Sequence, residues 1–174
     1  MTATPEPTHA GSPAIQRFLQ MLEQEHATTM KVLRAYPADQ ADLRPAEKSK
    51  TARELACVFA VESRMGVDAA TTGFDFEKMS PPEIPADFSE IVDQVEAAHQ
   101  KLVETVRAQS EEHLHGTIQF FVGPKTLGDV VRMDFLWMLL HDQIHHRGQF
   151  SVYLRMAGGK VPSIYGPTAD EPWI

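Results

Sequence analysis

The sequence has little cysteine, few basic residues and no long apolar run, and each shortage excludes a class of protein. Cys57 is the only cysteine in 174 residues, so no disulfide can form within the chain, as is typical of proteins in a reducing cytoplasm. Lys and Arg number 16 against 24 Asp and Glu, and the basic residues are scattered, which argues against binding to a nucleic-acid backbone. No apolar run approaches the length of a transmembrane helix. We therefore expect a cytoplasmic protein whose partners include neither nucleic acid nor membrane.

The first residues also lack the features of a targeting segment. The stretch MTATPEPTHAGSP has no basic beginning and no apolar centre, so it does not read as a signal peptide. We predict that residues 1–12 form a disordered lead-in. The remaining residues, 13–174, have a length that fits one domain with a substantial core.

Four segments carry apolar residues at helical spacing, and polar or proline-rich stretches separate them. The predicted helices cover residues 13–35, 51–72, 88–109 and 129–157. Residues 117–129, TIQFFVGPKTLGD, are expected to be extended or looped, and the tail from Lys160 has no helical period. These features predict an all-α protein, an antiparallel four-helix bundle with long connections and an irregular tail. Because two of the three connections are long, simple up-down-up-down wiring does not follow.

Ionisable residues fall on the predicted apolar faces of two of these helices. In the last helix, Asp142 and His146 lie four residues apart near the middle of the apolar arc. His141 and His145 are also four apart, but roughly 100° round the helix, toward the border of that arc. Glu62 lies on the apolar stripe of the second helix. Buried ionisable groups are costly unless they are paired or bind a cation.

A metal site is one explanation of these inward residues. His26 and His99 lie on the apolar stripes of the first and third helices, and all of these positions fall near the middle of their helices. Imidazole nitrogen and carboxylate oxygen are ligands of divalent transition metals such as Zn, Ni, Fe or Mn. We predict a mononuclear site formed by Glu62, Asp142 and His146, with His26 as a fourth ligand.

A polar cluster without metal is the alternative, and the residues leave it open. A lone inward histidine is more often a hydrogen-bonded core residue than a ligand. Arg147 could act as the counter-ion of Asp142 or Glu62, which would neutralise the cluster without a metal. Cys57 lies one position off the apolar stripe, which favours a buried inert thiol over a nucleophile.

A short Glu-x-x-His motif occurs three times and raises the question of a dinuclear site. Paired motifs of this kind build di-iron sites in helical bundles. The glutamates lie about 60° from their histidines, at the edge of the apolar arc. The motif is also short enough to arise by chance in an acidic, histidine-rich chain, so a dinuclear site is not favoured. The three pairs are Glu23/His26, Glu96/His99 and Glu112/His115.

The end of the last predicted helix resembles a known family. The stretch HDQIHHRGQFSVYLRMAGGKVPSIYGP, residues 141–167, is similar to the closing segment of the DinB/YfiT-like proteins, DNA-damage-inducible four-helix bundles. Its specific parts are HHRGQ-x-x-x-YLR and G-x-x-VPSIYGP. The segments TARELA-x-VFA-x-E and ATTGFDF support the resemblance, which extends from about Pro13 to the C-terminus.

The resemblance implies a bundle, often a homodimer, in which one histidine from the second helix and two from the fourth hold a divalent metal. This chain departs from that pattern, because the first two of these positions fall at Val58 and Asp142, and only His146 matches. Glu62, one turn beyond Val58 on the same face, would replace the missing ligand. Two carboxylates and one histidine favour harder or borderline metals over soft ones.

Some relatives are thiol-dependent S-transferases or isomerases that use low-molecular-weight thiols, and many have no known activity. The resemblance therefore implies a metal-dependent thiol transferase or hydrolase, acting in stress or detoxification on an unknown small molecule. The metal would activate a bound thiol or water as a Lewis acid, and His145 or His141 at the rim would move protons. The alternative is a non-catalytic, stress-associated or structural homodimer whose inward polar cluster binds no metal.

Overall fold

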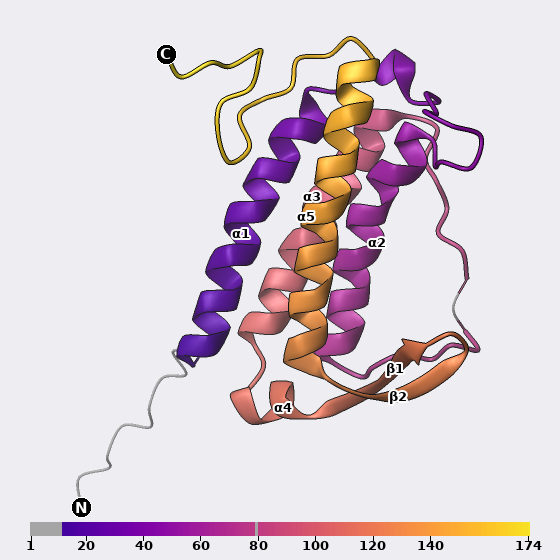
Figure 1. Cartoon of the computed structure of the whole chain (residues 1–174). Coiled ribbons are helices and arrows are strands. Elements are labelled where there is room, and N and C mark those ends of the chain that lie inside the picture. The colour runs from indigo at the N-terminus through magenta and orange to yellow at the C-terminus, as the bar shows by residue number, and fades with distance from the viewer. Residues whose placement is uncertain (1–11, 79) are drawn as a thin grey trace, which may run out of the picture.

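Four long helices pack side by side along most of the molecule (Figure 1). The computed structural model describes residues 12–78 and 80–174. The long helices are α1 (Pro13–Arg34), α2 (Ala52–Ala70), α3 (Phe88–Arg107) and α5 (Arg132–Met156). The shorter elements are a 3-10 turn (Ala38–Gln40), the helix α4 (Glu111–His115) and the strands β1 (Thr117–Gly123) and β2 (Thr126–Val131). Of the predicted disordered lead-in, residues 1–11 lie outside the described residues.

Three of the long helices, α1, α2 and α3, begin where the sequence supplies a capping side chain. Ser12 accepts a hydrogen bond from the backbone N–H of Ile15, and Pro13 follows at the first helical position, where its missing N–H costs nothing. Thr51 and Glu54 form a reciprocal capping box at the start of α2. Gly73, with φ of 81°, follows the end of α2 in a conformation that glycine adopts without strain. The four predicted helices therefore differ from the observed ones by at most three residues at either end.

Residues 117–131 form an antiparallel β-hairpin, so the expectation that residues 117–129 are extended or looped is confirmed, whereas the all-α prediction does not include this small sheet. Thr117 pairs with Val131 and Phe120 with Gly128, and the chain reverses at residues 124–125. Ile118 and Phe120 point to the bundle, where the Phe120 ring lies 4.5 Å from that of Phe135. Because residues 129–131 pair with β1, α5 begins at residue 132 rather than at 129.

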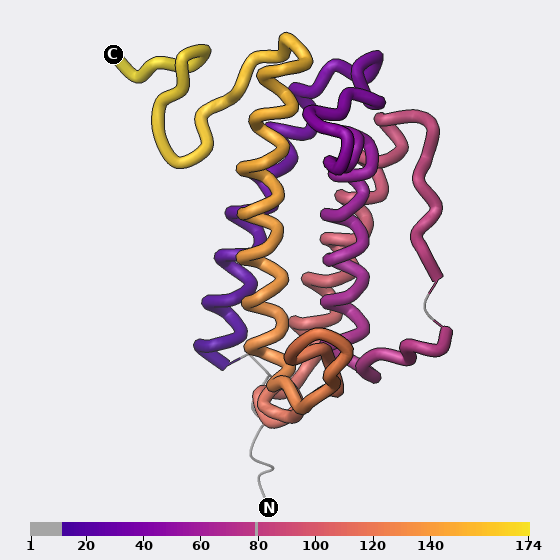
Figure 2. The backbone as a smooth tube through the Cα atoms, turned by 45° about the vertical axis from the view of Figure 1, so that its right-hand side comes forward, coloured from indigo at the N-terminus to yellow at the C-terminus, as the bar shows by residue number. Residues whose placement is uncertain are grey.

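Two pairs of neighbouring helices are parallel, α1 with α5 and α2 with α3, so the bundle is antiparallel only in part and lacks the simple up-down-up-down wiring that the long connections left open. At one end of the molecule, the last turns of α1 and α5 pack with the first turns of α2 and α3. At the other end, the first turns of α1 and α5 pack with the last turns of α2 and α3. Thus α1 and α5 point one way while α2 and α3 point the other (Figures 1 and 2). The antiparallel relation holds for α1 with α3 and for α2 with α5. The connection 71–87 runs back along the bundle, so α3 starts at the same end as α2 (Figure 1).

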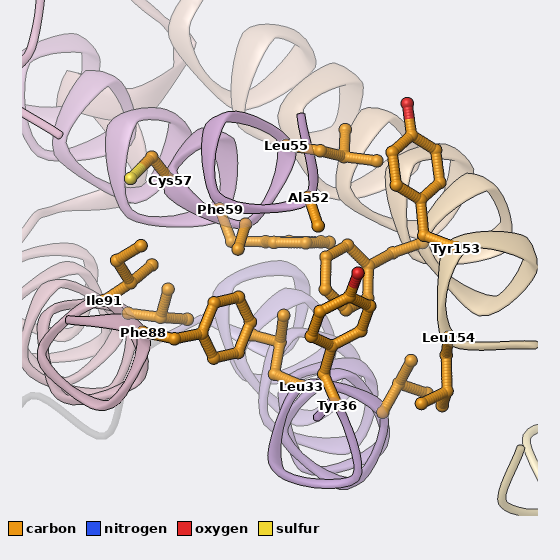
Figure 3. Close-up of a cluster of buried hydrophobic side chains, with 14 of the residues drawn as sticks. Leu33, Tyr36, Ala52, Leu55, Cys57, Phe59, Phe88, Ile91, Tyr153 and Leu154 are labelled. Carbon is orange, nitrogen blue, oxygen red and sulfur yellow. The ribbon is translucent and has the colours of Figure 1, made fainter. Parts of the chain in front are cut away.

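The larger core cluster fills the end of the bundle where α2 and α3 begin (Figure 3). The ring of Tyr36 packs against those of Phe88 and Phe150, with centroids 5.2 and 5.0 Å apart. Cys57 is buried in the same cluster, and burial raises the pKa of its thiol, which is the behaviour of an inert cysteine. None of the helices in the described residues is long and apolar enough to cross a membrane.

Candidate metal centre

Glu62, Asp142 and His146 meet on the seam between the antiparallel helices α2 and α5. His146 Nε2 lies 3.4 Å from Glu62 Oε1 and 3.7 Å from Asp142 Oδ1. One potential ligand atom from each residue lies within 4.8 Å of the others, and no second group of this kind occurs in residues 12–78 and 80–174. The structure therefore brings together the three residues that helical spacing selects.

The three side chains differ in depth. The side chain of Glu62 is 6% exposed, that of His146 18% and that of Asp142 50%. The centre is thus closed on the Glu62 side and open to solvent on the Asp142 side. The expectation that Asp142 and His146 lie in the middle of the buried arc is wrong, because Gln143 and Arg147 occupy that place and face the interior.

The buried carboxyl group of Glu62 lacks the donors that a carboxylate needs. Burial, together with the charge of Asp142 and a side-chain hydrogen bond with Asp142, raises the pKa of Glu62 to about 9. Glu62 Oε2 is buried with no hydrogen-bond partner in the described part of the chain. Either a proton or a cation must therefore offset the negative charge at this point.

The donor set fits a divalent metal ion. Two carboxylate oxygens and one imidazole nitrogen would hold the ion and would leave open positions on the exposed side, as in catalytic sites with three protein ligands. Two carboxylates would also balance a charge of +2. Val58, one turn before Glu62, is half-buried and carries no ligand atom, so Glu62 is the residue through which α2 reaches the centre.

Comparison with known proteins identifies the family. The sequence profile of the DinB family matches residues 7–173. This chain belongs to the DinB family. The uncharacterized protein YrdA of Bacillus subtilis (strain 168) is 26% identical over 160 residues, which cover 90% of this chain and 91% of YrdA.

Two solved structures share the DinB fold. A DinB-like protein from Bacillus cereus ATCC 10987 superposes with a TM-score of 0.71 at 24% identity, over 86% of this chain and 97% of that one. The DinB-like protein YjoA from Bacillus subtilis superposes with a TM-score of 0.68 at 20% identity, over 85% and 97% of the two chains. At these identities the likeness establishes the fold alone.

His26, the predicted fourth ligand, lies elsewhere in this DinB protein. Its ring stacks on that of His99 across the seam between α1 and α3, with centroids 3.5 Å apart and planes 2° from parallel. His26 Nε2 lies 3.7 Å from Glu96 Oε1, and Arg34 binds the same carboxylate. The structure does not bring His26 to the candidate metal centre, because His26 faces α3 rather than the α2–α5 seam.

The Glu-x-x-His motifs on α1 and α3 face each other without forming a dinuclear site. Their glutamates are engaged by arginines, Glu23 by Arg107 and Glu96 by Arg34. These motifs line a cleft of about 340 Å³ that is separate from the metal centre.

His141 and His145, which helical spacing placed toward the border of the apolar arc of α5, are exposed. The ring of His141 lies 6.2 Å from that of Trp137. His145 Nε2 lies 2.9 Å from the side-chain amide nitrogen of Gln149. Neither histidine belongs to the group of three ligand atoms, so a part in proton transfer stays a prediction for both.

Arg147 carries a buried charge, and its partner is neither of the two carboxylates that the sequence suggested. It pairs with Glu25 of α1 at 2.7 Å, and not with Asp142 or Glu62. Arg147 is 1% exposed, and it also donates to the hydroxyl of Tyr165 at 2.5 Å, which in turn donates to Glu25 Oε2 at 2.6 Å. Arg147 lies one position beyond His146, a rotation of about 100° that turns it toward α1. The inward position of Glu25 on α1 was the signal that could have revealed this pair.

A cleft of about 490 Å³ lies beside the metal centre. Its walls include His146 and Gln149 of α5, Leu55 of α2 and Lys50 of the preceding connection. The cleft adjoins His146 but touches neither carboxylate. A small molecule in this cleft would therefore lie next to the centre, on the side of its histidine.

Proposed function

We propose that this DinB protein binds one divalent transition metal ion through Glu62, Asp142 and His146. The observation that supports the proposal most directly is the buried Glu62 carboxyl group, which faces His146 Nε2 and Asp142 and has an oxygen without a partner in the described residues. A bound Zn, Ni, Fe or Mn ion would supply the missing positive charge.

The proposed activity is metal-dependent transfer of a low-molecular-weight thiol, or hydrolysis, in stress or detoxification. The bound ion would act as a Lewis acid that favours the deprotonated form of a thiol or water. Glu62 and Asp142 would balance its charge, and the exposed side at Asp142 would admit the reacting group. The cleft beside His146 would hold the rest of a small-molecule substrate. His145 and His141 at the rim would accept or deliver protons.

A second candidate is a structural or stress-associated homodimer without metal or catalysis. The raised pKa of Glu62 favours this candidate, because a neutral carboxyl group hydrogen-bonded with Asp142 needs no cation. Both candidates are proposed as cytoplasmic homodimers. Light scattering after size exclusion measures the subunit number independently of the metal.

Elemental analysis decides between the two candidates. The protein is purified without an affinity tag or added metal, beside Asp142→Ala and His146→Ala. Asp93→Ala serves as the control, because Asp93 is an exposed aspartate on α3, away from the centre. We expect about one equivalent of a transition metal in the wild type and in the control, and loss of that metal in both site variants. The absence of metal from every sample after incubation with Zn, Ni, Mn and Fe(II) would exclude the metal-dependent function.

A further inference from the structure

Gln149 connects the two neighbouring histidines of α5 through its side-chain amide. The amide oxygen lies 3.0 Å from His146 Nδ1, and the amide nitrogen lies 2.9 Å from His145 Nε2. The spacings of three and four residues place all three side chains on one side of α5. Gln149 also lines the cleft beside the metal centre, together with His146.

With the Gln149 amide in this orientation, its oxygen toward His146 and its nitrogen toward His145, the two contacts assign the positions of the imidazole protons. An amide oxygen can only accept a hydrogen bond, so His146 Nδ1 must carry a hydrogen. An amide nitrogen can only donate, so His145 Nε2 must present its lone pair. A neutral His146 then has its own lone pair on Nε2, the atom 3.4 Å from Glu62 Oε1 and 3.7 Å from Asp142 Oδ1.

We propose that Gln149 is a positioning residue that holds His146 in the tautomer able to bind a metal. The effect of this tautomer on metal binding rests on the proposed function, since only a metal site needs the free Nε2 lone pair. The opposite tautomer, with the hydrogen on Nε2, would direct an N–H group at the position of the ion and block binding. His145 contributes by accepting from the amide nitrogen, which fixes the orientation of the amide oxygen toward His146.

Two near-isosteric substitutions test this role in different directions. Gln149→Leu removes both contacts and frees His146 to adopt either tautomer. Gln149→Glu keeps an oxygen acceptor for His146 Nδ1–H, and a carboxylate in that place increases the basicity of a ligating histidine. Gln24→Leu is the matched control, because Gln24 is an exposed glutamine on α1.

The first measurement needs no metal. Long-range ¹H–¹⁵N correlation spectra of the metal-free protein, labelled with ¹⁵N-histidine and recorded at pH 8, report which nitrogen of each neutral imidazole carries the hydrogen. We expect Nδ1–H for His146 in the wild type, in Gln149→Glu and in the control, and a mixture of tautomers in Gln149→Leu.

The second measurement is titration of the same proteins with Zn²⁺. We expect the affinity of Gln149→Leu to fall by about 10- to 100-fold and that of Gln149→Glu to equal or exceed the wild type. Nε2–H at His146 in the wild type, or an unchanged tautomer and affinity in Gln149→Leu, would overturn the proposal. The expected tautomers in a protein that does not bind Zn²⁺ or any other metal tested would uphold the role of Gln149 and refute the proposed function.

Discussion

The carboxyl group of Glu62 is almost wholly withdrawn from water, and this gives the candidate site a measurable pH dependence. The pKa of Glu62 is about 9 in the folded protein against an ordinary value of 4.5, because burial and the nearby Asp142 disfavour its charge. Between pH 4.5 and 9 the metal-free folded protein therefore holds a proton that the unfolded chain has released. The stability that this extra bound proton gives the folded protein is full below pH 4.5. It is lost as pH rises to 9, by about 1.4 kcal/mol per pH unit.

We expect Glu62→Gln to remove the loss of stability with rising pH, because glutamine has the shape of the protonated acid but cannot ionise. Urea unfolding of the metal-free proteins between pH 6 and 9 should show the variant becoming progressively more stable than the wild type. Added Zn²⁺ should stabilise the wild type and not the variant. Glu104→Gln, at an exposed position of α3, is the control and should follow the wild type. A constant difference between Glu62→Gln and wild type across this pH range would contradict the raised pKa.

Single residues of the site could be predicted where helical period alone decides the direction of a side chain. Glu62 satisfies that condition, and it meets Asp142 and His146, which helical spacing also selected although they lie at the edge of the buried arc of α5 rather than in its middle. The partner of Arg147 could not be predicted from α5, because it depends on the rotation of α1 and on the path of the tail that carries Tyr165.

At the scale of elements, the seam between α1 and α3 contains two largely buried imidazoles, whose surroundings favour the neutral form. Burial lowers the pKa of both His26 and His99 to about 4 from the ordinary 6.5, and the charge of Arg34 assists at His26. Between pH 6.5 and 4 the unfolded chain binds protons that the folded protein excludes. The stability that these residues provide is thus full above pH 6.5 and is lost as pH falls to 4, by about 1.4 kcal/mol per pH unit for each histidine.

We expect His99→Phe to weaken this acid sensitivity, since phenylalanine can stack on His26 but cannot bind a proton. Denaturant unfolding at pH 7.5 and at pH 5 measures the loss of stability on acidification, which should be smaller in the variant. His115→Phe, at an exposed position of α4, should lose as much as the wild type. Equal losses in all three proteins would show that the stacked pair does not sense acid.

The hairpin shows why some elements escape prediction from the sequence. The segment from Thr117 to Val131 mixes apolar residues with Gly, Asp and Lys, and only Ile118 in it is buried. Its pairing is determined by the turn at residues 124–125 and by packing of Phe120 on Phe135 and Phe74, a contact between segments far apart in the chain. The long helices, in contrast, bury residues at their own helical spacing, and three of them, α1, α2 and α3, also begin at a residue whose side chain caps the helix.

At the scale of the molecule, one attachment of the C-terminal tail to the bundle is a single hydroxyl group, beside the ion pair of Arg155 with Asp170 and the buried side chain of Val161. Tyr165 is 66% exposed, yet its hydroxyl lies between the buried charges of Arg147 and Glu25. We expect Tyr165→Phe to lower the free energy of unfolding by about 1 to 3 kcal/mol, because two charged groups lose a hydrogen bond. Trp173→Phe, at another exposed aromatic residue of the tail, should have little effect. Chemical denaturation measures both, and equal stability of Tyr165→Phe and wild type would refute the attachment.

The direction in which each helix runs relative to its neighbours could not be determined from the sequence. The connection between Ala70 and Phe88 holds 17 residues, which reach about 56 Å when extended, whereas α3 is about 30 Å long. Such a connection can start the next helix at either end of the bundle. The observed choice makes α2 and α3 parallel, and it depends on packing of all four helices at once.

The placement of the candidate ligands on α2 and α5 also has a consequence for how the protein is made. Glu62 and His146 are separated by 84 positions (146 − 62). At about 5 to 20 residues per second, a ribosome needs roughly 4 to 17 seconds to pass from the first to the second. During that interval neither Asp142 nor His146 is present to meet the α2 carboxylate, because α5 is the last helix of the described residues to emerge. If the proposed metal ion binds, its uptake would therefore belong to the end of translation or later, when the cellular pool of free ions, rather than the order of folding, would decide which ion enters.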